Sequence, residues 1–198
     1  MTRKNIVISS EYGSGARIIG QYVAEELGMK FYNEDAILTK VANELRIDEN
    51  VLRNYDEKLL SFIFDDFTQM DGSTLDANVY APMRIYQAMS SVILKTIEEG
   101  PCILMEGCAD QILRGKVDFL HVFIYTPDTK AKIERTVNLG GILEKDALKH
   151  IFIQDNQRGF YHNIFSDSEW GNMKEYDLCL NSSAFEIEQC IEIIKSAL

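Results

Sequence analysis

The sequence has few of the residues that would divide the chain into domains or cross-link it. It has 3 prolines in 198 residues, and no linker, repeat or low-complexity tract interrupts it, so we expect a single domain over residues 1–198. Its 4 cysteines form no CxxC pair and its 3 histidines are scattered, which favours reduced thiols and argues against a zinc site. No apolar run approaches the roughly 20 residues that a membrane span needs.

Positive charge is also scarce. The 20 Lys and Arg residues are outnumbered by 31 Asp and Glu residues, for a formal net charge of -11. Broad nucleic-acid binding needs a basic surface, so we expect no nucleic-acid partner. A phosphate group can still bind in one local positive pocket. Because the first residues also show no secretory pattern, we expect a cytoplasmic protein with no membrane partner.

What the chain does have is an opening strand, a glycine-containing turn and an amphipathic helix. We expect the strand at about residues 5–9 and the helix from about residue 16, with Ile19, Val23 and Leu27 on its buried face. This is the layout of a phosphate-binding loop, in which backbone N–H groups and a helix N-terminus hold phosphate oxygens. The expected nucleotide-binding residues of this loop are Ser10, Gly13, Ser14, Gly15, Ala16, Arg17 and Ile18.

The loop lacks the lysine of the usual G-x-x-x-x-G-K-[ST] signature. Aligned with that signature, Ser10 stands at the first glycine, Ala16 at the lysine and Arg17 at the residue after it. Arg17 is our candidate for the missing charge, because a planar guanidinium suits phosphate oxygens. The alternative is that Arg17 is a solvated helix residue.

Strands alternate with helices along the rest of the chain. We expect strands at 30–32, 102–105, 119–125 and 177–180, and helices at 80–99, 128–139 and 144–165, with a closing helix that buries Ile187, Cys190, Ile191 and Ile194. Continuous apolar strands separated by helices are typical of an α/β fold with a parallel sheet.

Several segments resemble the cytidylate kinase-like family. They lie, in order, at residues 12–17, 24–28, 31–33, 108–114, 169–171 and 176–183. The family is similar to nucleoside monophosphate kinases. The resemblance therefore implies a three-layer P-loop kinase-like fold, with a five-stranded parallel sheet in the order 2-3-1-4-5. It also implies an acceptor-side helical region at about 34–78 and a lid-like helical region at about 141–172.

The resemblance further implies a phosphotransferase that uses ATP and Mg²⁺ on a small-molecule acceptor. Arg17 and Arg158 would be catalytic, and Asn181 and Ser182 would contact the nucleotide. Glu106, which departs from the family pattern, is our candidate to hold the metal at a strand end, like the acidic residue that ends a Walker-B strand. The alternative is a polar residue where the strand leaves the core. A homodimer stays open. The residues expected on the acceptor side are Tyr32, Asn33, Arg84, Gln87 and Asp110. Two alternatives stay open. Asn33 could be a helix cap, and Arg84 and Gln87 could be solvated helix residues.

Two departures from the family pattern bear on activity. The Gly-Arg that precedes Cys-Ala-Asp in the family is Glu106-Gly107 here, and residues 155–163 keep Arg158 as their one arginine. Phosphoryl transfer depends on cations near the transferring oxygens. Three hypotheses therefore remain: a nucleoside monophosphate kinase, a catalytically weak nucleotide- or anion-binding protein, and a kinase of a non-nucleotide small molecule. Arg158 could also form a mere surface pair with Asp155.

Overall fold

The computed structural model describes residues 5–50, 52, 80–105 and 108–198. Of these, residues 80–84 are described by their backbone alone. Two compact units make up the chain, one combining residues 1–33 with residues 100–198 and the other spanning residues 34–99. The sheet belongs to the first unit, which also carries the opening glycine-containing loop.

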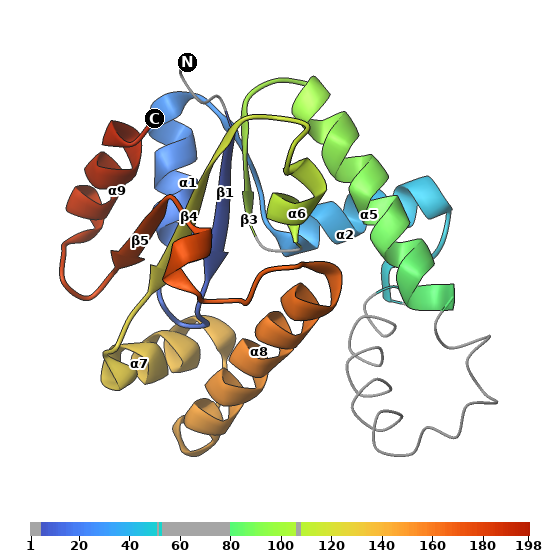
Figure 1. The fold of residues 1–198 in the computed structure, drawn as a ribbon. Coiled ribbons are helices and arrows are strands. Elements are labelled where there is room, and N and C mark those ends of the chain that lie inside the picture. The colour runs from blue at the N-terminus through green and yellow to red at the C-terminus, as the bar shows by residue number, and fades with distance from the viewer. Residues whose placement is uncertain (1–4, 51, 53–79, 106–107) are drawn as a thin grey trace. The chain divides into compact units, whose positions relative to one another are not determined.

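A five-stranded sheet in the order β2-β3-β1-β4-β5 forms the centre of the first unit (Figure 1). Every neighbouring pair of strands is parallel. The expected α/β fold and strand order are therefore confirmed. The strands are β1 (Asn5–Ser10), β2 (Lys30–Tyr32), β3 (Cys102–Met105), β4 (Phe119–Tyr125) and β5 (Leu178–Asn181).

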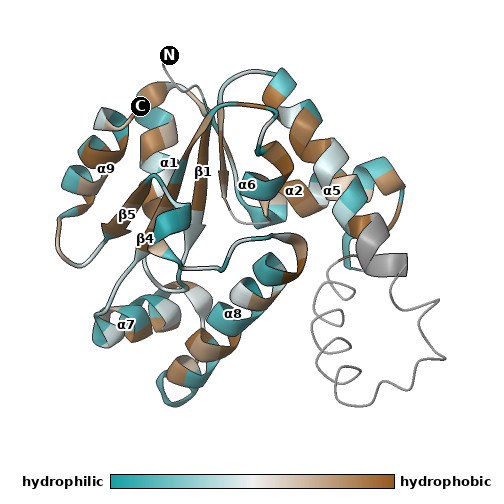
Figure 2. Ribbon diagram, viewed as in Figure 1, coloured by the Kyte–Doolittle hydropathy of each residue, from teal (hydrophilic) through white to brown (hydrophobic). Residues whose placement is uncertain are grey.

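The central strand is buried because its neighbours cover both of its edges. All six residues of β1 are buried, and Ile8 pairs with Met105 on one side and Val122 on the other. Figure 2 shows β1 as hydrophobic over its first part and paler toward its carboxyl end. That end carries Ser9 and Ser10, so the polar residues of the strand lead into the loop.

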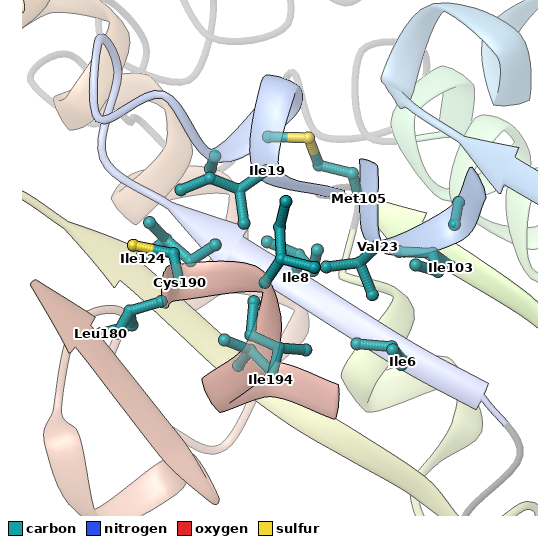
Figure 3. Close-up of a cluster of buried hydrophobic side chains, with 14 of the residues drawn as sticks. Ile6, Ile8, Ile19, Val23, Ile103, Met105, Ile124, Leu180, Cys190 and Ile194 are labelled. Carbon is teal, nitrogen blue, oxygen red and sulfur yellow. The ribbon is translucent and has the colours of Figure 1, made fainter. Parts of the chain in front are cut away.

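Two helices cover one face of the sheet, α1 (Ala16–Leu27) and α9 (Ile187–Ser196). Their apolar side chains meet those of the strands in one buried cluster, as Figure 3 shows. The contact is close: a Cβ on Gly20 of α1 would lie 2.9 Å from the Phe31 ring and 3.0 Å from Ile8. The cluster includes Ile6, Ile8, Ile19, Val23, Ile103, Met105, Ile124, Leu180, Cys190 and Ile194.

Alternate residues of β4 point to the opposite face, where aromatic rings gather. The Phe123 ring lies 4.8 Å from the Tyr176 ring, centroid to centroid and tilted by 38°, and meets Trp170 edge-on at 5.4 Å. His121 lies 4.5 Å from Tyr176. Trp170 thus packs against the sheet, as one expects of a large apolar side chain. Tyr176 follows the short 3-10 helix Met173–Glu175.

Two further helices, α7 (Thr129–Gly140) and α8 (Glu144–Phe165), lie beyond the carboxyl ends of β1 and β4 (Figure 1). The side chain of Asp128 caps α7 by accepting the N–H of Ala131. The short helix α6 (Ala109–Leu113) follows β3 along the chain.

The second unit contains helices α2 (Glu34–Leu45) and α5 (Tyr80–Glu98), which pack on each other. Glu44 of α2 accepts hydrogen bonds from Ser91 and Lys95 of α5. Among the helices of the described ranges, none is both long and apolar enough to cross a membrane.

Candidate functional site

The segment between β1 and α1 is a tight loop whose glycines have left-handed backbone angles. Gly13 has φ +74° and Gly15 has φ +84°, a region that residues with a Cβ rarely adopt. Gly15 is the N-cap of α1, and its carbonyl accepts the N–H groups of Ile18 and Ile19. The loop therefore delivers its backbone directly to the positive end of a helix dipole, where phosphate groups bind.

Gly13 is also required by a neighbour. A Cβ at this position would lie 3.1 Å from the carbonyl oxygen and 3.2 Å from the Cα of Lys132 in α7. The main chain of α7 thus passes directly over the loop, and no larger residue fits between them without movement. This close approach places the side chains of α7 around the loop.

Residues at the carboxyl ends of β4 and β5 hold the loop through hydrogen bonds. The hydroxyl of Ser182, which follows β5, donates to the Ser14 carbonyl at 2.6 Å. The Glu11 N–H donates to the Ile124 carbonyl at 3.0 Å, and the Glu11 carboxylate accepts the Thr126 N–H at 3.1 Å. The loop is therefore tied to β4 and β5 before any ligand is present, which lowers the cost of ordering it around one.

Two arginines contact the loop backbone. Arg135 of α7 donates to the Gly13 carbonyl at 3.0 Å. Arg158 of α8 donates to the Ser10 carbonyl at 2.8 Å and to the Ser10 hydroxyl at 3.2 Å. Its guanidinium also lies 5.5 Å from the centroid of the Tyr12 ring. These contacts give an acidic protein a local concentration of positive charge.

A lysine and two carboxylates complete the surroundings of the loop. The Nζ of Lys132 lies 2.8 Å from the Glu11 carboxylate and 3.4 Å from that of Asp155 in α8. The other oxygen of Asp155 accepts the Tyr12 N–H at 2.6 Å. Burial raises the pKa of Asp155; the Tyr12 hydrogen bond and the charges of Lys132 and Arg158 only partly offset it, and Glu11 adds to it.

The structure brings the expected loop residues together at one place, the carboxyl end of β1. Ser10 and Ser14 are buried there, whereas the side chain of Arg17 is exposed on α1. Arg158 reaches Ser10, so its contacts go beyond a surface pair with Asp155. The hydroxyl of Ser182 is likewise turned onto the loop.

The remaining expected residues belong to other segments of the chain. Asn181 ends β5 and its side chain accepts the N–H and hydroxyl of Ser183. Tyr32 ends β2, and Asn33 directly precedes α2. In the other unit, Gln87 is an exposed residue of α5, and Arg84 lies on the same helix with its side chain outside the description. Glu106 falls outside the described residues. The roles assigned to all of these stay predictions.

Asp110, expected on the acceptor side, is only 1% exposed. His162 Nε2 of α8 lies 3.4 Å from its carboxylate, and Gln111 donates to the same oxygen at 3.3 Å. Burial alone would raise the pKa of Asp110, but the hydrogen bond to His162 and the charges of His121 and His162 hold it below its ordinary value. In this state Asp110 connects α6 to α8.

Sequence analysis missed Lys132, Arg135 and Asp155 as members of the site. A signal for two of them exists: Lys132 and Arg135 are spaced i, i+3 and so share one face of a helix that follows a central strand. Nothing in the sequence shows that this face meets the loop. In the part of the chain that the structure describes, no cluster of three or more His, Cys, Asp or Glu residues could hold a metal.

The parallel sheet order, with a glycine loop between its central strand and the first helix, defines a P-loop kinase-like protein. The chain belongs to the cytidylate kinase-like family, whose model matches residues 5–184. A comparison with curated proteins by sequence finds no match.

Solved structures share the fold over nearly the whole chain. An uncharacterized protein from Eubacterium ventriosum has a TM-score of 0.69 at 21% identity, covering 98% of this chain and 97% of its own. A shikimate kinase from Bacteroides thetaiotaomicron has a TM-score of 0.53 at 11% identity, covering 97% and 96%. A sugar kinase from a Janibacter species has a TM-score of 0.52 at 15% identity, covering 98% and 94%. At these identities the likeness concerns the fold.

Proposed function

We propose that this protein is a nucleotide-dependent phosphotransferase that uses ATP with Mg²⁺ as donor and a small molecule as acceptor. The observation that carries the proposal is the glycine loop at the start of α1, with Lys132, Arg135 and Arg158 all in contact with loop residues. Membership of a kinase-like family points the same way. Phosphoryl transfer needs little beyond positioning and positive charge, and this loop offers both.

Each part of the loop has a distinct task in this proposal. The two glycines, Gly13 and Gly15, let the backbone approach the donor phosphates, which the N–H groups at the start of α1 bind. Arg135 and Arg158 offset the negative charge that shifts between oxygens as the phosphoryl group leaves. Bound Mg²⁺ would neutralise further charge on the donor phosphates, with Glu106 as its proposed protein ligand.

A non-nucleotide acceptor is favoured over CMP. Arg158 is the only arginine or lysine in residues 155–163, and Glu106-Gly107 replaces the Gly-Arg of the family pattern. A phosphorylated acceptor would need cations of its own. Solved structures with this fold include kinases named for shikimate and for sugars, which supports a small hydroxylated acceptor. We therefore expect CMP to be a poor acceptor.

A second candidate function is nucleotide or anion binding without efficient transfer. Two observations favour it: Ala16 replaces the loop lysine, and the Nη1 of Arg158 already donates to Ser10. Such a protein would use the same loop and bind the same phosphates. It would differ from a kinase only in turnover.

Two measurements separate these functions. The first is the affinity for ATP with excess Mg²⁺ by isothermal titration calorimetry. The second is ATP consumption against a panel of nucleoside monophosphates, nucleosides and small hydroxylated metabolites. Consumption that depends on one acceptor supports the kinase. Binding of ATP with no acceptor-dependent consumption supports the binding protein, and a protein that does not bind ATP contradicts both.

A further inference from the structure

One carboxylate of the protein is held in the way that P-loop proteins hold phosphate. Asp155 accepts the backbone N–H of Tyr12 through Oδ1 at 2.6 Å, and its Oδ2 lies 3.4 Å from the Nζ of Lys132. Tyr12 belongs to the loop, whereas Lys132 comes from α7 and Asp155 from α8. An anion therefore bridges a loop amide and a lysine.

The pairing of a loop N–H with an ammonium group is the donor set that a phosphate-binding loop uses, with its lysine as the point charge. Here the lysine position of the loop itself is Ala16, and the neighbouring Arg17 is exposed. Lys132 is better placed than Arg17, because its side chain is 12% exposed and its backbone is fixed against Gly13. The charge that the loop lacks has a source on the adjoining helix.

We propose that Lys132 is the phosphate-binding lysine of this loop and that Asp155 is an internal anion which the phosphate of a bound nucleotide displaces. This inference rests on the proposed function. It adds the role of Lys132 and the competition between Asp155 and phosphate, neither of which follows from family membership. Glu11 stays with Lys132 during the exchange, since its carboxylate also accepts the Thr126 N–H.

The charges around the loop support an exchange of Asp155 for phosphate. Four charged groups meet here: Lys132 from α7, Arg158 and Asp155 from α8, and Glu11 from the loop. A polyphosphate that joins them adds negative charge to a site that already holds two carboxylates. Burial has raised the pKa of Asp155, so its ionised form is less well stabilised here than it is in water. Asp155 is therefore the group that leaves, or takes up a proton, when phosphate arrives.

The proposal gives opposite expectations for two substitutions. Lys132→Met keeps an unbranched apolar stem and removes the charge, so the affinity for polyphosphate should fall by about tenfold or more. Asp155→Asn keeps the shape and removes the competing charge, so the affinity should rise by several-fold. If Lys132 and Asp155 only supported the shape of the loop, both variants would bind polyphosphate more weakly than the native chain. Lys130→Met is the matched control, because Lys130 is on the same helix and its side chain is 87% exposed.

The experiment measures dissociation constants for tripolyphosphate and for ATP with Mg²⁺, by calorimetry, on the full chain and these three variants. The expected result is weaker binding in Lys132→Met, tighter binding in Asp155→Asn and an unchanged constant in Lys130→Met. Lys132→Met that binds like Lys130→Met, or Asp155→Asn that binds more weakly than the native chain, overturns the inference and leaves the proposed function standing. If the native chain binds neither probe, the proposed function falls with it. Should Lys132→Met fail to fold in a thermal melt, the result for Asp155→Asn decides.

Discussion

The hydroxyl of Ser182 donates to the backbone carbonyl of Ser14 across 2.6 Å, and both residues are buried. This one contact joins the end of β5 to the middle of the glycine loop, which lies 168 residues earlier in the chain. Buried carbonyls that lose their donor keep the cost of desolvation. Ser182 therefore contributes to the shape of the loop whether or not it also contacts a nucleotide.

We predict that Ser182→Ala lowers the free energy of unfolding by about 1–3 kcal/mol and weakens ATP binding. The reason is the unpaired Ser14 carbonyl, which frees the loop to take other conformations. Urea denaturation and calorimetry measure the two effects. Ser183→Ala is the control, since the exposed Ser183 hydroxyl donates within its own turn, to Asn181. Equal effects in the two variants would contradict the role given to Ser182.

The second prediction concerns the closeness of α7 to the loop. Gly13→Ala places a methyl group 3.1 Å from the Lys132 carbonyl oxygen, at a residue with φ +74°. The left-handed backbone alone costs about 1–2 kcal/mol, and the contact adds to it. Gly115→Ala is a matched control, because Gly115 has φ +73° and no atom within 4 Å of its Cβ position.

Gly13→Ala should therefore destabilise the fold more than Gly115→Ala does, and it alone should abolish ATP binding. Denaturant titrations of both variants give the difference in stability, which isolates the contact from the backbone strain. If both variants lose the same stability and both bind ATP, the loop tolerates a side chain beneath α7. The close approach of α7 to Gly13 then does not limit ATP binding.

The fold could be predicted because local pattern and global architecture agree. Helix α8 begins and ends at the expected residues, 144 and 165, and the strand order follows from the family resemblance. The differences lie at the ends of helices and strands: a helix expected at 128–139, for example, spans Thr129–Gly140 as α7. The expected end of β1 was Ser9, but Ser10 pairs with Ile124 of β4. Where a strand ends depends on its pairing with neighbouring strands, and that register is set by packing between segments far apart in sequence.

The loop could be found from sequence, but its charged neighbours could not. Glycines and a following amphipathic helix are adjacent in the chain, so they form a readable pattern. The contacts of Arg135 with Gly13 and of Asp155 with Tyr12 span 122 and 143 residues. Only the packing of α7 and α8 against the loop brings them together. Family resemblance pointed to basic residues at 155–163 and so drew attention away from Lys132 on the preceding helix.

The third prediction is that Arg158→Ala lowers turnover more than it lowers the affinity for ATP. In the structure the Nη1 of Arg158 donates to Ser10, which places its guanidinium beside the loop where the phosphoryl group would be transferred. A charge that acts mainly in the transition state lowers kcat by about 10²-fold or more when it is removed. Steady-state kinetics with an accepted substrate, together with ATP titration, measure the two effects separately.

Arg114→Ala serves as the control for Arg158→Ala, because Arg114 is about half exposed and pairs with Glu175 away from the loop. Arg114→Ala should leave both kcat and the affinity for ATP unchanged. Arg17→Ala tests the other arginine: weaker ATP binding would support its predicted role at the loop, and unchanged binding would show that it is a solvated helix residue. If Arg158→Ala keeps native turnover, the arginine supports the loop and has no part in transfer.

The last prediction concerns pH. Burial lowers the pKa of His121 below its usual value near 6.5, although the charge of Asp110 and a hydrogen bond with the Glu175 carbonyl act in the opposite direction. The folded chain then binds this proton less readily than the unfolded chain does. The stability that neutral His121 contributes is present above about pH 6.5 and is lost as the pH falls toward the lowered pKa.

The free energy of unfolding should therefore decline below pH 6.5 in the native chain and decline less in His121→Gln, which cannot take up a proton. His121 Nε2 lies 3.3 Å from the Ser9 hydroxyl, and on protonation this nitrogen changes from acceptor to donor. Denaturant titrations from pH 7.5 to pH 5.5 on both proteins give the two slopes, and the NMR titration of the His121 ring gives its pKa directly. The pKa of Asp110 is held below its ordinary value, so this carboxylate stays ionised over the whole pH range in the native chain. A ring pKa at or above 6.5, or equal slopes for both proteins, would show that His121 takes up its proton inside the fold without cost.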